Sequence, residues 1–297
     1  MRRLLGIILI VMGVLVAVAT LGGTFLYQFM TGQEMIDSTS LSIDGINQIE
    51  VDTRSSNVTL LATDSDQIHV ELKTEDKRTK FNTYSHGDKL TIEVNQPRFQ
   101  FLGHVITWFM GEFHQEVQIA IPRSYHGELV VDGSSGHITV NDLQGLSRLL
   151  VDNSSGHVNI ENVEADFFQF DGSSGHFTAR QLTTKQTEID ISSGKVVLEK
   201  VTGQIRGNSS SGSIIIDVDR LDAPIRWAGS SGTITLRLPE DASFELDAST
   251  SSGSIHSDFP IQVNSQSNRQ LRGTVGDGKV PIELRVSSGS IKIERSN

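Results

Sequence analysis

The sequence predicts an all-β protein built as a single-chain parallel β-solenoid (β-helix) of about 19–20 residues per coil. Three observations indicate this fold: a tripeptide that recurs at nearly fixed spacing, columns of apolar residues that follow it, and a change of phase in the apolar pattern across it. The tripeptide is Ser-Ser-Gly, and its copies lie 18 to 21 residues apart, except for a last gap of 36 residues, close to two periods. Its eight glycines are Gly136, Gly156, Gly175, Gly194, Gly212, Gly232, Gly253 and Gly289.

An apolar residue stands two positions after each of these glycines. The residue four positions after the glycine is also apolar in every copy but one, and the residues between are mostly polar. Alternation with a period of two is typical of a strand with one buried face. A second alternating stretch precedes the tripeptide, for example at Leu149 and Val151, so each repeat supplies two strands. The first apolar column contains Ile138, Val158, Phe177, Val196, Ile214, Ile234, Ile255 and Ile291.

The tripeptide is expected to form a corner, because the apolar phase does not continue through it. Glycine adopts positive φ without steric cost, and serine can hydrogen-bond the local backbone. After the second strand a looser return closes the coil. Such coils bury their apolar faces by stacking in parallel on a shared core. An antiparallel sandwich of hairpins also explains the alternation, but not columns that keep one residue type across many repeats.

The region before the first glycine is similar in kind but less regular. Val51–Leu60 resembles a degenerate first repeat with Asn57 in the place of the glycine, and Asn tolerates left-handed geometry better than most residues. Near the other end, the polar stretch Asn264–Lys279 interrupts the last two coils and is expected to be a surface loop. Strand-like alternation also marks three segments that precede the repeats, Gln67–Lys73, Lys89–Asn95 and Glu116–Ile121.

Residues 1–33 form the predicted N-terminal transmembrane helix, which serves as an anchor. The apolar span 4–30 carries no charge and exceeds the roughly 20 residues that cross a bilayer. A cleaved signal peptide is the alternative, with Ala17-Val18-Ala19 as the cleavage site, although the apolar run continues past it. Arg2 and Arg3 favour a cytoplasmic N-terminus. We therefore expect a single-pass cell-membrane protein that contacts the bilayer through residues 4–30 and whose bulk is extracytoplasmic.

Residues 34–297 then form the extracytoplasmic β-solenoid domain, in which residues 126–297 carry the Ser-Ser-Gly repeats. The chain has a net charge of −11, which disfavours binding to the phosphates of nucleic acid and to anionic lipid surfaces. It contains no cysteine, so neither a lipoprotein anchor nor a disulfide framework is available. We expect no nucleic-acid partner.

Two polar columns flank the corner. His137, His157 and His176 each follow the glycine, and stacking would place their imidazoles roughly 5 Å apart in a row. A histidine row beside a carboxylate row could bind zinc or sense acidification. The alternative is that exposed corners of duplicated coils simply repeat polar residues, and a ladder does not provide tetrahedral geometry, so no metal or cofactor is expected. The carboxylate row lies four positions before the glycine and contains Asp132, Asp152, Asp171 and Asp190, followed by Asn208.

An apolar insertion at residues 97–115 interrupts the pattern. Its aromatic and aliphatic side chains include Phe101, Trp108, Phe109 and Met110, and the stretch is too short and interrupted for a second membrane span. One interpretation is an exposed loop that contacts the bilayer or a membrane-protein partner. The other is a cap over an open end of the solenoid core.

The sequence does not predict an enzyme. No serine in the repeated corners differs from its copies, and no histidine is set apart as a matched base. Polysaccharide-active β-helix enzymes usually carry a local cluster of acids and bases, and no such cluster stands out. We expect no catalytic residues, with polysaccharide cleavage as the weakest alternative.

The repeats SSGHITVNDLQG, SSGHVNIENVEA, SSGKVVLEKV and SSGSIKIE resemble the bacterial putative-adhesin domain family, a domain of unknown function. The resemblance covers most of residues 45–297 and implies a β-solenoid. With the start MRRLLGIILIVMGVL, the chain resembles membrane-anchored members associated with the cell-envelope stress response of Gram-positive bacteria. This implies a non-enzymatic module that binds a membrane-protein or cell-wall partner, and a surface adhesin for a glycan or polymer is the alternative.

Overall fold

A computed structural model describes residues 31–76, 79–95, 115–267 and 269–296. The predicted membrane segment 4–30 and the residues Phe101, Trp108, Phe109 and Met110 lie outside these residues. The first strand begins at Thr31, so the last three residues of the segment 1–33 belong to a strand. Across the described part of the chain, no helix has the length and apolar character needed to span a membrane.

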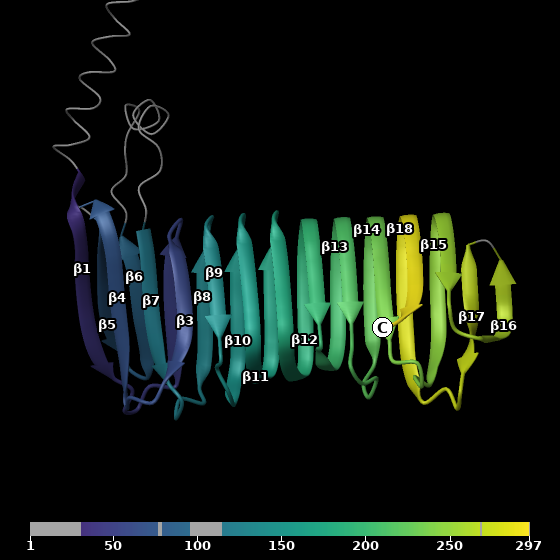
Figure 1. Cartoon of the computed structure of the whole chain (residues 1–297), viewed down its shortest axis with the longest axis horizontal. Helices are drawn as coiled ribbons and strands as arrows, with labels where there is room; N and C mark the ends of the chain where they lie inside the picture. The colour runs from purple at the N-terminus through teal and green to yellow at the C-terminus, as the bar shows by residue number, and fades with distance from the viewer. Residues whose placement is uncertain (1–30, 77–78, 96–114, 268, 297) are drawn as a thin grey trace, which may run out of the picture.

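All regular elements of the described residues are β-strands, which lie side by side along a rod (Figure 1). They are β1 (Thr31–Ser42), β2 (Gln48–Arg54), β3 (Asn57–Thr63), β4 (Gln67–Asp76), β5 (Lys80–His86), β6 (Lys89–Asn95), β7 (Gln115–Pro122), β8 (Glu128–Gly133), β9 (His137–Asn141), β10 (Leu146–Asn153), β11 (His157–Gly172), β12 (His176–Glu199), β13 (Thr202–Asp217), β14 (Ile225–Leu238), β15 (Phe244–Ser257), β16 (Gln262–Ser267), β17 (Gln270–Val275) and β18 (Val280–Arg295). The strands predicted before the repeats are confirmed as β4, β6 and β7.

Each coil has two walls. The first wall contains the strand that leads into the Ser-Ser-Gly corner, and the second wall contains the strand that leaves it. Along the first wall β10 runs parallel to β8, with Val151 beside Val131. Along the second wall β11 runs parallel to β9, with Val158 beside Ile138. The apolar columns of both walls are buried in one continuous core, so the predicted parallel β-solenoid is confirmed.

The corner glycines are required for two reasons. All eight have φ between +114° and +148°, a region that L-residues with a side chain rarely adopt. They also stack closely, since a Cβ on Gly194 would lie 2.0 Å from the carbonyl oxygen of Gly175 in the next coil. That oxygen accepts a hydrogen bond from the backbone N of Lys195 at 3.0 Å. The repeated glycine therefore sets how closely the coils stack.

A second corner closes each of four consecutive coils. Six positions after the glycine, Asp142, Asn162, Gln181 and Lys200 take φ between 52° and 59°. These polar residues in the left-handed conformation end the second wall. The segment that closes the coil, which the sequence predicted to be a looser return, is therefore a defined turn in these four coils.

The assignment of Asn57 to the glycine position is wrong. Because Val58 pairs with Ile138, Asn57 stands beside His137, and its Oδ1 accepts a hydrogen bond from the His137 backbone N at 3.0 Å. Arg54 instead takes the left-handed conformation, with φ of 51°. A register shift between Asp52 and Arg54 accounts for the difference.

The prediction of a surface loop at Asn264–Lys279 is also wrong, because most of this stretch forms a β-hairpin. β16 pairs antiparallel with β17, and β17 pairs antiparallel with β15. The last coil in the sequence is not the last in space, since β18 lies between β14 and β15, parallel to both. The strands at the far end of the rod, β15 to β17, therefore precede β18 in the sequence, although β18 lies between β14 and β15 in space.

Antiparallel strands close both ends of the rod (Figure 1). At one end β5 covers β6, while β4 covers β7 and is itself covered by β1. At the other end the β16–β17 hairpin covers the first-wall part of β15. Such caps protect strands that would otherwise expose a row of unpaired backbone groups.

Candidate binding groove

The three histidines form the predicted row on the second wall. The imidazole centroids of His137 and His157 lie 4.8 Å apart with an angle of 3° between ring planes, and those of His157 and His176 lie 4.9 Å apart at 8°. All three side chains are exposed. Asn57 Oδ1, 3.2 Å from His137 Nδ1, ends the row at the N-terminal side.

This stacking does not direct the ring nitrogens toward a common point. Imidazole binds a metal through a lone pair in the ring plane, and these planes are nearly parallel. Two nitrogens on one zinc ion, each at 2.0–2.1 Å, are at most about 4 Å apart, which is less than the spacing of the rings. Within the described residues, no group of three or more His, Cys, Asp or Glu side chains is placed to hold a metal ion.

The carboxylate row lies on the first wall and is longer than the sequence indicated. Register pairs link Glu93 to Asp52 and Asp52 to Asp132, so two acids extend the row beyond the repeats. The remaining steps run through Asp152, Asp171, Asp190 and Asn208 in adjacent strands. Like charges placed directly opposite one another in a sheet repel.

Burial and mutual repulsion act on this row. Burial, followed by the charges of Glu50, Asp152 and Asp52, raises the pKa of Asp132. Burial, followed by the charge of Asp171, raises the pKa of Asp152. Ionisation of Asp132 and of Asp152 therefore costs stability.

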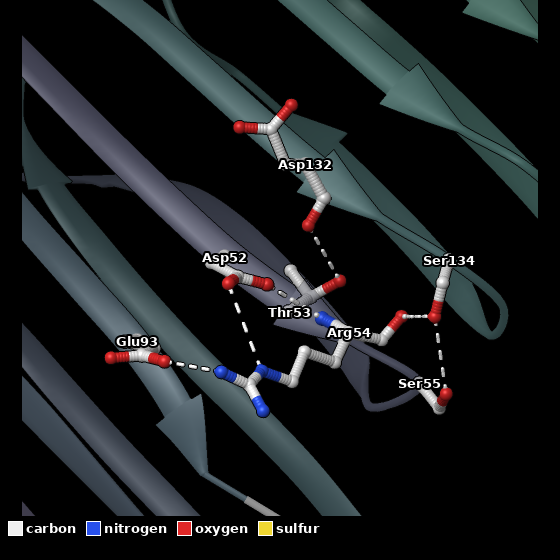
Figure 2. Close-up of polar contacts among 7 residues, drawn as sticks. All are labelled: Asp52, Thr53, Arg54, Ser55, Glu93, Asp132 and Ser134. Atoms are coloured by element: carbon white, nitrogen blue, oxygen red, sulfur yellow. Dashed lines mark hydrogen bonds and ion pairs between the residues drawn. The ribbon is translucent and has the colours of Figure 1, made fainter.

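Arg54 neutralises the N-terminal end of the row (Figure 2). Its guanidinium donates to Glu93 Oε1 at 2.5 Å, and its Nε lies 3.7 Å from Asp52 Oδ2. The Arg54 carbonyl oxygen at this corner also has a partner within the protein, because it accepts a hydrogen bond from Ser134 Oγ at 2.9 Å. The polar groups at this end therefore bond mainly to each other.

A long groove follows the first wall beside the corners of the next seven coils. Its volume is about 810 Å³, and seven coils stacked at about 4.8 Å give it a length of roughly 30 Å. One side carries the carboxylates of Asp152, Asp171 and Asp190, and Arg285 lies toward the other end. The first serine of six of the eight Ser-Ser-Gly corners forms a rim, made of Ser173, Ser192, Ser210, Ser230, Ser287 and Ser251.

These six serines differ from Ser134 in their bonding. All six are exposed, and among the described residues none of their hydroxyls bonds to another protein group, whereas Ser134 donates to a carbonyl. Each hydroxyl can therefore donate one hydrogen bond and accept others from a ligand. The groove therefore offers the same donor and acceptor in six of its seven coils.

The sequence located parts of this groove without identifying it. It predicted the aspartate column and the serine corners, but not that both line one hollow on the first wall. The histidines follow the corner on the second wall and do not line the groove. Arg285 was missed because it belongs to β18, whose position between β14 and β15 cannot be inferred from the repeat spacing.

The chain belongs to the Toastrack DUF4097 family, whose model matches residues 46–294. This agrees with the putative-adhesin resemblance of its repeats. No curated protein matches the sequence.

Solved structures to which this chain is similar are described as putative adhesins. A putative adhesin from Bacteroides fragilis NCTC 9343 is 10% identical, with a TM-score of 0.51, and the match covers 87% of this chain and 97% of that one. A putative adhesin from Parabacteroides distasonis ATCC 8503 is 14% identical, with a TM-score of 0.44, and the match covers 89% and 99% of the two chains. At these identities the likeness to the Bacteroides protein establishes a common fold alone.

Proposed function

We propose that this protein is a non-enzymatic, membrane-anchored binding module that holds an extended, hydroxyl-rich polymer of the cell envelope along the first-wall groove. The groove is the observation that carries the proposal. It is open, and a serine hydroxyl recurs in six of its seven coils, which matches a polymer better than a compact small molecule.

The chemistry of the groove favours a glycan over an apolar peptide. Its rim consists of exposed hydroxyls and its sides carry carboxylates and an arginine, so ligand hydroxyls can donate to Asp side chains and accept from Ser or Arg. Each neutral hydrogen bond adds only about 0.5–1.5 kcal/mol. Useful affinity therefore requires several coils to bind at once, and a polymer provides this.

The same proposal places the groove outside the membrane, with the N-terminal cap next to the bilayer. In the N-terminal cap, Thr31 pairs with Asp76, and Gln115 pairs with Thr74 two residues away on the same strand. The apolar segment 4–30 and the apolar insertion 97–115 therefore join the described fold at the same end of the cap. On this arrangement Phe101, Trp108, Phe109 and Met110 contact the bilayer or a membrane-protein partner.

The finer assignment is to the envelope stress response. The basic and apolar start of the chain, followed by this domain, resembles LiaG, a membrane-anchored protein of a Gram-positive envelope-stress operon. We propose a LiaG-like role in which the bound polymer is part of the protein's own cell wall. Adhesion to an external glycan is the alternative, and it would use the same groove.

The proposal is tested by co-sedimentation of the full chain, in detergent, with purified insoluble Gram-positive cell wall. Changing Ser192, Ser210 and Ser230 together to alanine removes three rim hydroxyls. Three hydrogen bonds of about 1 kcal/mol each amount to roughly a hundredfold loss of affinity.

The matched control changes the second serine of the same three corners, Ser193, Ser211 and Ser231, to alanine. These residues are also exposed but do not line the groove. We expect the control to bind as the wild type does. An equal loss of affinity for cell wall in the two triple variants, or no binding by the wild type, would contradict the proposed function.

A further inference from the structure

A second, smaller recess opens beside the groove, with a volume of about 250 Å³. Three guanidinium groups, those of Arg206, Arg226 and Arg285, line it, although the protein as a whole is acidic. The recess shares Asn208, Ala228 and Arg285 with the groove, so the two hollows are adjacent on the first wall.

The register of three coils brings the arginines together. Arg206 of β13 pairs with Arg226 of β14, and Arg226 pairs with Glu283 of β18. In the column two residues further along, Ala228 pairs with Arg285. The small side chain of Ala228 leaves a hollow between the longer side chains around it. This cluster depends on the position of β18, because Arg285 is far from Arg226 in the sequence.

The carboxylates at the recess do not form ion pairs with all three arginines. Glu283 contacts two of the arginines, with Oε1 2.5 Å from Arg285 and Oε2 3.7 Å from Arg226 Nε. Arg206 has no carboxylate within 4.0 Å among the described residues. When the side-chain amide of Gln204 is oriented with its oxygen toward Arg206, this oxygen accepts a hydrogen bond from Arg206 Nε at 2.7 Å. Gln204 is neutral, so it does not balance the charge of Arg206.

Two carboxylates of neighbouring strands lie close to the recess but do not line it. Glu188, opposite Arg206 in β12, accepts a hydrogen bond from Gln186 at 2.7 Å. Asp247, next to Glu283 in β15, is paired with Arg272 at 2.9 Å. Among the residues that line the recess, three exposed arginines therefore face one carboxylate, that of Glu283.

We propose that this recess binds an oxyanion, carboxylate or phosphate, carried by the polymer in the groove. The ligand would then be an anionic glycan or polyol phosphate. The inference rests on the proposed function and adds the charge of the ligand to it. Guanidinium groups suit both oxyanions because their fork of N–H donors can bind two oxygens at once. The hydroxyls of the polymer would lie along the serine rim, with one anionic group held by Arg206 and Arg285.

The test measures binding of three soluble polymers to the full chain in detergent: neutral dextran, polygalacturonate, which carries carboxylates, and a glycerol phosphate polymer. We expect at least one anionic polymer to bind about tenfold more tightly than dextran, and this preference to fall as salt is raised. A charge-assisted hydrogen bond contributes about 1.5–3 kcal/mol, so Arg206→Gln should weaken anionic binding about tenfold or more and leave dextran binding unchanged.

Arg180→Gln is the control, because Arg180, like Arg206, is exposed but lies on the second wall. It should bind all three polymers as the wild type does. If dextran binds as tightly as both anionic polymers, or if Arg206→Gln and Arg180→Gln behave alike, the anion site is refuted and the polymer groove stands. If none of the polymers binds, both proposals fail. The two anionic arms distinguish carboxylate from phosphate.

Discussion

The stacking of the corner glycines makes Gly194→Ala the most informative perturbation of the fold. The new Cβ would lie 2.0 Å from the Gly175 carbonyl oxygen and 3.0 Å from its carbonyl carbon. Both are backbone atoms of a stacked coil, so neither can rotate away. To accommodate the methyl group the coils must separate, which breaks the hydrogen bond from Lys195 N to that oxygen.

The expected cost has two parts. Holding alanine at the φ of Gly194, +133°, costs about 1–3 kcal/mol. Losing a hydrogen bond and leaving its groups unsatisfied adds about 1–3 kcal/mol. The sum, roughly 2–6 kcal/mol, is a large fraction of the 5–15 kcal/mol that usually stabilises a domain.

The control is Gly45→Ala. Gly45 also has positive φ, +74°, but no heavy atom lies within 4 Å of an added Cβ, so only about 1–2 kcal/mol of backbone strain is expected. Gly136→Ala should be intermediate, because its nearest contact, the Ser56 carbonyl oxygen, is at 2.8 Å. Guanidinium denaturation followed by circular dichroism measures all three. Equal losses in Gly194→Ala and Gly45→Ala would refute the close-stacking argument.

Three further predictions concern the core, the carboxylate row and the apolar insertion. Ile214→Asp should unfold the domain, because Ile214 is 1% exposed and an unpaired buried charge costs several kcal/mol, whereas Ser213→Asp should be mild because Ser213 is exposed; equal thermal shifts would refute the column assignment. Asp132→Asn should raise the melting temperature at pH 7. A carboxyl whose folded pKa is raised stabilises the fold when protonated and loses that contribution as pH rises through the folded pKa, so the gain should shrink as pH falls toward the ordinary value of 3.8; a gain that persists at pH 3 would contradict this cause. The double change Trp108→Ser and Phe109→Ser should leave the melting temperature of a fragment of residues 31–297 unchanged but abolish flotation of that fragment with liposomes. If the unchanged fragment does not float and the double change greatly lowers its stability, the insertion is a structural cap instead.

The parts of the fold that repeat along the chain were predictable from the sequence. The columns around Ile138 and Val158, the histidine row and the aspartate row each lie at a fixed number of residues from the corner glycine. Stacking of the glycines therefore places equivalent residues in register, and the structure shows them there.

The parts that depend on the order of coils in space were not predictable. The last gap of 36 residues is consistent with an omitted coil, but the chain instead forms the β16–β17 cap and returns as β18 between β14 and β15. Leu271 and Val275 alternate with polar residues and are each 8% exposed, so a strand signal was present in the expected loop. The recess around Arg226 and Arg285 could not be inferred, since it exists only because of this return.

Hydrogen–deuterium exchange of the full chain, with and without the cell-wall polymer that it binds, tests the central claim most directly. The account predicts slower exchange along the first wall and its corners, at residues 171–173, 190–192, 208–210, 228–230, 249–251 and 285–287, which line the groove. It predicts no change at His137, His157 and His176 on the second wall. Protection centred on the second wall, or confined to the caps at the ends of the rod, would contradict the claim that the groove is the binding site.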